Sequence, residues 1–139
     1  MGEESRHTLH ILAEVGRLSE VSVFVKNAFL GFGFDDKFCR QIDIVVEEIY
    51  VNIASYAYPK GHGCVDVECS ADDDTGTLIF RDQGIPYNPL DKEDPETEDP
   101  YKMTIGGYGI FMVKEIMDEV IYEYDANSKE NVLTLRKKR

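Results

Sequence analysis

The chain has 139 residues, of which 42% are hydrophobic and 30% are charged, a composition typical of a folded domain rather than a disordered segment. Its 27 acidic residues outnumber the 15 basic ones and leave a net charge of −12, which argues against nucleic-acid binding because phosphates would be repelled. No run approaches the roughly 20 apolar residues of a membrane-spanning helix, and the opening MGEESRH lacks the apolar stretch of a signal peptide. We therefore expect one cytoplasmic domain over residues 1–139, without nucleic-acid or membrane partners.

The chain opens with a predicted strand and a predicted helix. Apolar and polar residues alternate in HTLHILAE, residues 7–14, which is typical of a half-buried strand. A helix is predicted over about residues 20–30, because apolar residues recur there at helical spacing and Gly31 follows. Ser19 could cap the N-terminus of this helix.

A longer second helix is predicted next. Either Asp35 or Asp36 could cap its N-terminus with a side-chain oxygen. The helix is expected to run to about Tyr58, because a residue that precedes a proline, here Pro59, disfavours helical geometry.

The rest of the chain is predicted to form two β-hairpins, separated by a long loop and a third helix. The predicted strands are CVDVECS (64–70), TLIFRD (77–82), EVIYEYD (119–125) and NVLTLRK (131–137). Residues 83–105 form an irregular segment that holds all but one of the 5 prolines, and the third helix is expected over about 107–118. This order predicts an α+β fold with helices on one face of a largely antiparallel sheet.

The cysteines and the basic end of the chain carry no clear functional signal. Cys39, Cys64 and Cys69 include no CxxC pair, and we interpret them as reduced thiols without a disulfide or a zinc site. The basic residues 136–139 are interpreted as a solubilising end rather than as a binding patch.

The second predicted helix carries a polar strip beside its apolar face. At about 100° per residue, the apolar side collects Ile42, Val45, Val46, Ile49 and Ile53. The strip along the edge of that side consists of Gln41, Glu48, Asn52 and Ser55. Glu48 and Asn52 are four positions apart and are therefore neighbours, whereas Glu47 points to nearly the opposite side and should be solvated.

Glu48 and Asn52 have two interpretations. They could simply be boundary residues of an amphipathic helix, since such pairs are common. Alternatively, a carboxylate and an amide oxygen one turn apart could serve a hydrated Mg²⁺, an ion that takes few protein ligands and keeps its waters and substrate phosphates. The carboxylate could also take a proton from a nucleophile.

The segment FRDQGIPYNP, residues 80–89, is a second candidate site. Asp82 ends a strand, where its carboxylate could accept a hydrogen bond from an exocyclic amine such as that of adenine. Gly84 would let the backbone approach a flat ring closely. In isolation, an ordinary Asx turn is the better interpretation of the same residues.

The glycine-rich segment IGGYGIFMVKEI, residues 105–116, is a third candidate. Gly106, Gly107 and Gly109 lie where a loop becomes a helix, and exposed amides together with the helix dipole favour phosphate at such a position. A flexible glycine hinge is the alternative. The pattern is not that of a P-loop, GxxxxGK[ST].

Taken in this order, the three segments resemble those of the GHKL ATPases, which share the Bergerat nucleotide-binding fold. VVEEIYVNIASYAY is similar to the N-box of that superfamily, DQGIPYNP to its D-x-G box and GGYGIFMVKEI to its glycine box. The resemblance covers about residues 8–136 and is strongest to the anti-sigma factor serine/threonine kinases. It implies a two-layer α/β sandwich of the histidine-kinase-like ATPase type, with a mixed, mostly antiparallel sheet.

The resemblance also implies roles for individual residues. Glu48 matches the carboxylate that acts as general base, and Asn52 matches the Mg²⁺ ligand. Asp82 matches the aspartate that binds adenine, and Gly84 the glycine beside the ring. An ATP lid would span about residues 87–105. The implied cofactors are ATP and Mg²⁺, and the implied nucleotide-binding positions of the glycine box are Gly106, Gly107, Tyr108 and Gly109.

Two positions depart from the family pattern. Pro86 replaces the second glycine of D-x-G-x-G, as in many members of this branch. Ile105 stands just before the glycine box, where the sporulation kinases carry an arginine near the phosphates, and the nearest base is Lys102. Positive charge supplies much of the transition-state stabilisation in phosphoryl transfer. The absence of this arginine therefore argues against efficient transfer.

The function implied by the resemblance is that of an ATP- and Mg²⁺-dependent anti-sigma factor. Such a protein holds a sigma factor inactive and, as a serine/threonine kinase, phosphorylates a STAS-type antagonist protein. The resemblance also makes a homodimer plausible. Two alternatives stay open: a regulatory module that binds ATP without transferring phosphate, and an interaction protein whose pocket is vestigial.

Overall fold

The structure, a computed structural model, describes residues 6–91 and 108–139. Its strands are β1 (Arg6–Leu12), β2 (Cys64–Ala71), β3 (Thr75–Asp82), β4 (Glu119–Asp125) and β5 (Glu130–Lys138). Its α-helices are α1 (Leu18–Gly31), α2 (Asp36–Tyr56) and α4 (Tyr108–Ile116). Two short 3-10 helices, η2 (Val15–Arg17) and η3 (Pro89–Asp91), complete the described elements.

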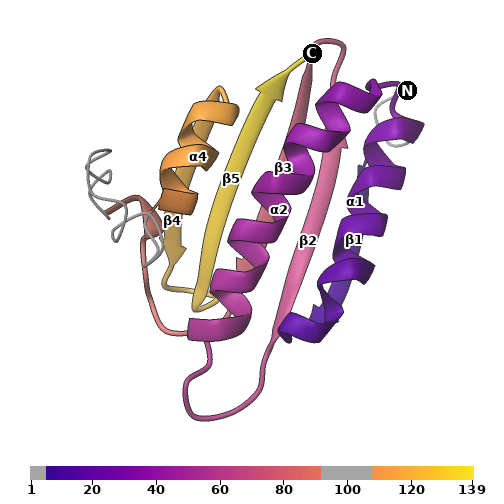
Figure 1. Cartoon of the computed structure of the whole chain (residues 1–139). Helices are drawn as coiled ribbons and strands as arrows, with labels where there is room; N and C mark the ends of the chain where they lie inside the picture. The colour runs from indigo at the N-terminus through magenta and orange to yellow at the C-terminus, as the bar shows by residue number, and fades with distance from the viewer. Residues whose placement is uncertain (1–5, 92–107) are drawn as a thin grey trace.

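The strands form one sheet in the order β1-β2-β3-β5-β4. Every neighbouring pair among the described strands is antiparallel. The helices lie together on one face of this sheet, with α2 in the middle between α1 and α4 (Figure 1). The predicted α+β class, with two layers and helices on one face, is confirmed. None of the helices in the described ranges has the length and apolarity needed to cross a membrane.

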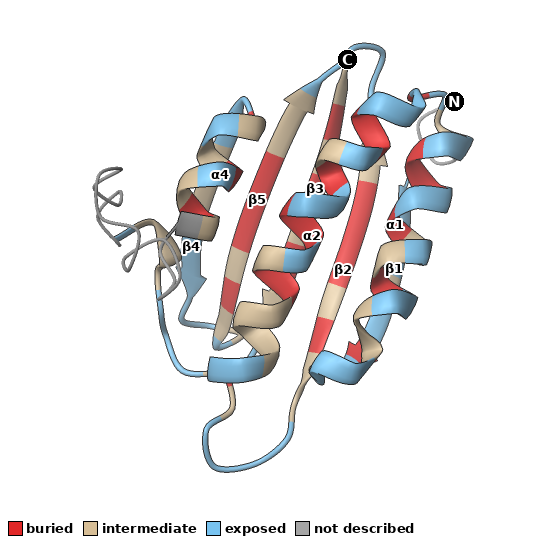
Figure 2. Cartoon of the chain, in the orientation of Figure 1, coloured by how far each residue is buried: buried red, intermediate tan, exposed pale blue. Residues whose placement is uncertain are grey.

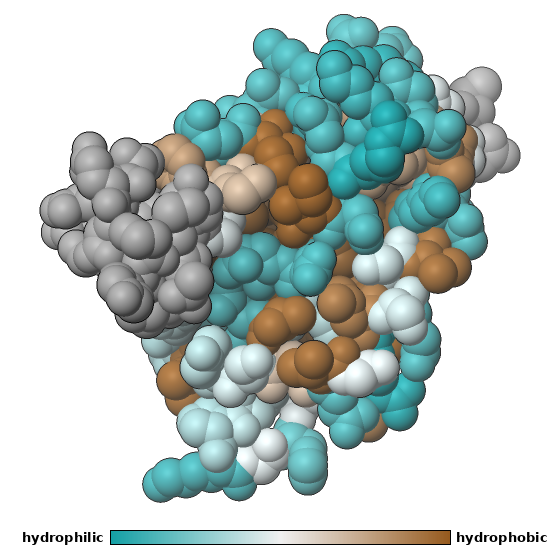
Figure 3. Space-filling view, viewed as in Figure 1, coloured by the Kyte–Doolittle hydropathy of each residue, from teal (hydrophilic) through white to brown (hydrophobic). Residues whose placement is uncertain are grey.

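The core fills the space between the helical layer and the sheet (Figure 2). On β3, residues alternate so that Leu78 and Phe80 are buried beneath the helices. The apolar side predicted for α2 is buried, except that Ile53 is only half-buried: the fully buried members are Ile42, Val45, Val46 and Ile49. The outer surface of the helical layer is mostly hydrophilic, with apolar groups between the charged ones (Figure 3).

Tyr50 connects α2 to the end of β1. Its side chain is completely buried, and its hydroxyl accepts a hydrogen bond from the backbone N–H of Glu14 at 3.0 Å. The same hydroxyl donates its one hydrogen between the carbonyl oxygens of Leu12 and Glu14, which lie 2.8 and 2.6 Å away. This polar anchor was not among the core residues expected from the helical pattern, because a tyrosine hydroxyl needs buried partners that the pattern does not show.

The N-cap expected at Ser19 is wrong. Helix α1 already begins at Leu18, and its N-cap position is Arg17, which makes no capping hydrogen bond with its side chain. The cause is η2, since the chain enters α1 directly from this 3-10 turn and leaves no extended residue for a serine cap. In α2, by contrast, the Asp35 side chain accepts a hydrogen bond from the Phe38 N–H at 2.8 Å, so one of the two predicted caps is confirmed.

The basic C-terminal residues are not merely a solubilising end. The Arg139 guanidinium lies 4.1 Å from the centroid of the Phe34 ring, and it donates to the carbonyl oxygens of Gly33 and Asp73 at 2.8 and 2.9 Å. Lys137 donates to the Ile116 carbonyl at 3.1 Å. These side chains tie the end of β5 to three other segments of the fold.

Candidate functional site

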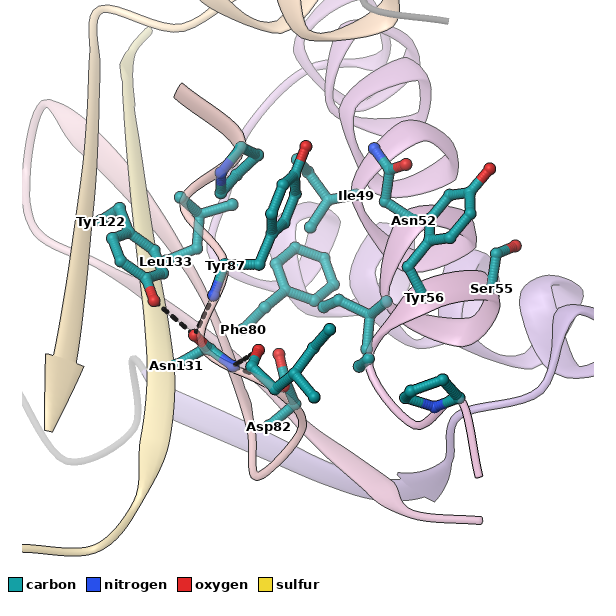
Figure 4. Close-up of a pocket in the computed structure, with 15 residues that line it drawn as sticks. Ile49, Asn52, Ser55, Tyr56, Phe80, Asp82, Tyr87, Tyr122, Asn131 and Leu133 are labelled. Atoms are coloured by element: carbon teal, nitrogen blue, oxygen red, sulfur yellow. Dashed lines mark hydrogen bonds between the residues drawn. The ribbon is translucent and has the colours of Figure 1, made fainter. Parts of the chain in front are cut away.

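A cavity of about 470 Å³ opens between α2 and the sheet. Its walls come from α2, from the ends of β3 and β5, from β4 and from the segments that follow α2 and β3 (Figure 4). Most of the lining is aromatic or aliphatic. The polar side chains that interrupt it are Asn52, Ser55, Asp82, Asn131 and the hydroxyls of Tyr56, Tyr87 and Tyr122. An apolar cavity with few polar groups is the common form of a small-molecule site.

Asp82 is the only carboxylate among the described residues that line this cavity. It is the last residue of β3 and is 6% exposed. Its Oδ1 accepts hydrogen bonds from the Gly84 N–H at 2.9 Å and from Asn131 Nδ2 at 3.0 Å. Burial raises the pKa of Asp82, and these two hydrogen bonds oppose the increase. Within the described part of the chain both bonds fall on Oδ1, so Oδ2 can still accept a hydrogen bond.

Asn131, which the sequence analysis missed, joins Asp82 to the neighbouring loop. It faces Asp82 in the β3–β5 register and is buried. Besides Asp82, its Nδ2 donates to the Ile85 carbonyl at 3.0 Å. Its Oδ1 accepts from the Tyr87 N–H at 3.2 Å and from the Tyr122 hydroxyl. Figure 4 shows Tyr122, Asn131 and Asp82 together at one end of the cavity.

Gly84 packs against the end of α2. A Cβ atom at this position would lie 2.3 Å from the carbonyl oxygen of Ala57, which leaves no space for a side chain. The same carbonyl accepts a hydrogen bond from the Ile85 N–H at 2.9 Å. Close packing against Ala57 therefore explains why this position is a glycine. The role of Gly84 beside an adenine ring stays a prediction.

Tyr58 fixes the loop after β3 from the other side and was also missed. Its hydroxyl donates to the Cys64 carbonyl at 2.7 Å and accepts from the Gln83 N–H at 2.8 Å. Burial raises the pKa of this hydroxyl. The backbone beside Asp82 is thus tied both to the end of α2 and to the start of β2.

Glu48 and Asn52 are neighbours on α2, as the helical spacing predicts. Asn52 Nδ2 donates to Glu48 Oε2 at 2.9 Å, and both side chains are half-buried. Asn52 lines the cavity on the α2 side, near Ser55 and Tyr56 (Figure 4). Glu47 is exposed, as expected. Because Asn52 uses its amide N–H toward Glu48, its oxygen is the atom available to a cation.

The glycine-rich segment is described only in part. Gly106 and Gly107 lie outside the described residues, as do Lys102, Ile105 and most of the predicted lid. Tyr108 is the first residue of α4 and Gly109 is the second. Gly109 is in contact with the Glu48 side chain. Of the predicted site residues that the structure describes, Asn52 and Asp82 line the cavity. Glu48 contacts both Asn52 and Gly109, and Gly84 donates its N–H to Asp82, but Glu48, Gly84 and Gly109 are not part of the cavity lining.

This arrangement fits a purine nucleotide with a hydrated divalent cation. A flat, apolar base suits the aromatic and aliphatic walls, and the buried Asp82 carboxylate supplies an acceptor for an exocyclic amine. The amide oxygen of Asn52 is the kind of neutral ligand that a Mg²⁺ with bound phosphates accepts. None of the described lining residues is a lysine or an arginine.

The fold and this site agree with the comparison against protein families. Residues 11–137 match the model of the histidine kinase-like ATPase domain. The match spans nearly the whole chain, so the chain belongs to this family. This confirms the GHKL-type ATPase superfamily and supports ATP binding. A search of the curated proteins found no match.

Proposed function

We propose that the protein is an ATP- and Mg²⁺-binding regulator of the anti-sigma type that phosphorylates a serine or threonine of a STAS-type antagonist protein. The observation that supports it best is the cavity itself, which has the buried acceptor Asp82 in its wall and, on the α2 side, Asn52 hydrogen-bonded to Glu48. In this proposal, the group that binds the base and the group that holds the cation lie in different walls of one cavity, on β3 and on α2. Membership of the histidine kinase-like ATPase family supports the same ligand.

Each residue has a separate task in this proposal. Asp82 accepts a hydrogen bond from the exocyclic amine of adenine through its free oxygen. Through its amide oxygen, Asn52 would hold Mg²⁺, which would supply positive charge beside the phosphates. Glu48 takes the proton of the acceptor hydroxyl.

The transfer step in the proposal is an in-line substitution at the terminal phosphorus of ATP. The acceptor hydroxyl oxygen forms a bond to that phosphorus while the bond to the bridging oxygen breaks, and ADP leaves with the bond electrons. The hydroxyl proton passes to Glu48, so both charge and atoms balance. The products are ADP and a phosphorylated partner protein.

The second candidate is a regulatory module that binds ATP without transferring phosphate. One observation favours it: the described lining of the cavity contains no lysine or arginine. Phosphoryl transfer depends strongly on cationic stabilisation of the phosphates. In this alternative, nucleotide binding would change the affinity for a sigma factor or for a second copy of the chain.

One experiment separates the two candidates. The protein is incubated with Mg²⁺, ATP labelled on its terminal phosphate and a STAS-type protein from the same genome, and label on that protein is measured. Transfer to a serine or threonine supports the kinase, with Glu48→Gln as the inactive control. ATP binding in calorimetry without transfer to any tested STAS protein supports the module. Absence of ATP binding would refute both.

A further inference from the structure

The carboxylate of Glu48 lies directly on the first turn of α4. A Cβ atom built on Gly109 would stand 1.9 Å from Glu48 Oε1 and 2.0 Å from its Cδ, which is far inside van der Waals contact. Gly109 is the second residue of α4. The other carboxylate oxygen, Oε2, accepts the 2.9 Å hydrogen bond from Asn52. The carboxylate is therefore confined between the amide of Asn52 and the backbone of Gly109.

This contact depends on the absence of a side chain at position 109. Any Cβ there would overlap the carboxylate, and the atoms that would yield are the far end of the Glu48 side chain rather than backbone. An added methyl group would therefore move the carboxylate before it moved α4. An acidic group beside the first turn of a helix is also electrostatically favourable, because the N-terminal end of the helix dipole is positive.

We propose that Gly109 is a positioning residue for Glu48. The missing side chain lets α4 close against the carboxylate, which fixes the direction in which Glu48 points. The proposal rests on the proposed function in one respect: the positioned group matters because Glu48 accepts the proton in transfer. It differs from a role for Gly109 in contacting phosphate, since the group it acts on is a side chain of α2.

The proposal predicts that, in a double-mutant cycle without nucleotide, the effect of Gly109→Ala on Tm depends on Glu48 and is reversed or lost in the Glu48→Ala protein. Gly109→Ala alone should lower Tm by roughly 2–5 °C, because the methyl group displaces the carboxylate. In a Glu48→Ala background the overlap is gone and only helix propensity remains, which favours alanine over glycine. There, Gly109→Ala should leave Tm unchanged or raise it. Equal decreases in both backgrounds would overturn the proposal.

Glu47→Ala supplies the matched control for this cycle. Glu47 precedes Glu48 on the same helix but is exposed, so Gly109→Ala should lower Tm by the same amount with or without it. Coupling to Glu47 as strong as coupling to Glu48 would mean that the effect is general charge near α4, and the positioning role would be rejected.

A rescue experiment tests positioning apart from structure. Gly109→Ala should lower kcat for transfer by about 10²-fold, as expected for a misplaced base, while the affinity for ADP changes much less. Glu48→Asp, one methylene shorter, should recover part of kcat in the Gly109→Ala protein because it leaves room for the methyl group. A loss of ADP affinity that Glu48→Asp does not relieve would assign Gly109 to phosphate binding instead.

The Tm cycle tests the positioning role of Gly109, whereas nucleotide binding and phosphoryl transfer test the proposed function. If the wild type binds no nucleotide, the proposed function fails, and the Tm cycle still decides whether Gly109 seats Glu48. If nucleotide binds and transfer occurs but the Tm cycle is additive, the function stands and the inference fails.

Discussion

Asn131 and Asp82 face each other across the β3–β5 ladder, and the Asn131 amide donates to the Asp82 carboxylate over 3.0 Å. The same amide donates to the Ile85 carbonyl, and its oxygen accepts from the Tyr87 N–H. One buried side chain therefore orients the acceptor at the end of the cavity and holds the segment that follows it. Removing it should disturb both at once.

Asn131→Ala is expected to weaken ADP binding by roughly 10- to 100-fold, the range for losing a hydrogen bond to a charged group. It should also lower the free energy of unfolding by about 1–3 kcal/mol, because the Ile85 carbonyl and the Tyr87 N–H lose a buried partner. Calorimetric titration with ADP and urea denaturation measure the two effects.

Asn127→Ala is the control for Asn131→Ala, because Asn127 lies in the exposed turn between β4 and β5. It should leave ADP affinity unchanged. Asn131→Asp should be more damaging than Asn131→Ala at neutral pH, because it brings a second negative charge against Asp82. Full ADP affinity in either position-131 variant would show that Asn131 does not orient the acceptor.

Asp82 should determine which base is accepted. The wild type is expected to bind ATP more tightly than GTP, because a carboxylate accepts from the amine of adenine but meets the carbonyl oxygen of guanine. Asp82→Asn should reduce the preference by roughly 10-fold or more. Competition of both nucleotides against a fluorescent ADP measures the ratio. Equal ATP and GTP affinity in the wild type would contradict this role.

The same substitution should also change how stability depends on pH. Burial raises the pKa of Asp82 above 3.8, so the ionised carboxylate disfavours the folded state. The contribution of Asp82 to folding stability is most favourable below the pKa that it has in the unfolded state. This contribution is lost as pH rises through the higher pKa that it has in the folded state. The Tm of the Asp82→Asn protein, relative to that of the wild type, should therefore increase from about pH 4 to pH 7. A flat difference across that range would argue that the carboxyl is not shifted.

Tyr50→Phe should destabilise the fold without affecting the cavity. Tyr50 is completely buried and does not line the cavity. Removing its hydroxyl leaves the Glu14 N–H and two carbonyl oxygens without this partner, at a cost of about 1–3 kcal/mol in unfolding free energy. Tyr56→Phe, at a side chain that is 64% exposed, is the stability control and should change little. Urea denaturation of both variants gives the comparison.

The thiols should differ sharply in reactivity. Burial raises the pKa of Cys69 to about 12 and also raises that of Cys39, which disfavours the reactive thiolate. Cys64 is only half-buried. Ellman's reagent at mildly alkaline pH should therefore modify mainly one thiol of the native chain, and Cys64→Ser should abolish that fast reaction. Rapid modification of all the thiols before unfolding would contradict the burial of the other two.

Local pattern was enough to predict the elements and the faces of α2. The side that holds Ile42 and Ile49 is buried, and Glu48 meets Asn52 while Glu47 is exposed. Such features follow from 3.6-residue periodicity, which a single segment contains in full. Ser19 shows the limit of local pattern, because the preceding turn η2 changed the geometry that a cap requires.

The relationships that complete the site could not be predicted in this way. Asn131 meets Asp82 only because of the β3–β5 register, which the folding of the whole sheet determines. The contact between Glu48 and Gly109 depends likewise on how α4 packs beside α2. An asparagine at the start of a predicted strand was visible in the sequence, but its partner was not.

Glu48 and Asn52 share a hydrogen bond but offer different chemistry, so substituting each of them should have a different effect. Asn52→Ala should lower the Mg²⁺-dependent part of ATP affinity, because it removes the neutral oxygen ligand. Glu48→Gln should leave that affinity nearly intact and reduce phosphoryl transfer by about 10²–10⁴-fold, the usual contribution of a general base. ATP titrations with and without Mg²⁺, together with transfer of label to a STAS-type protein, distinguish the two.

Glu47→Gln is the internal control, since Glu47 is exposed and lies away from Asn52. It should change neither affinity nor transfer. If Glu47→Gln abolished transfer while Glu48→Gln did not, the assignment of the base would be wrong. If neither substitution mattered and the wild type bound ATP without transferring it, the absence of lysine and arginine from the described part of the cavity lining would explain the result. The chain would then act through nucleotide binding alone, as a regulatory module.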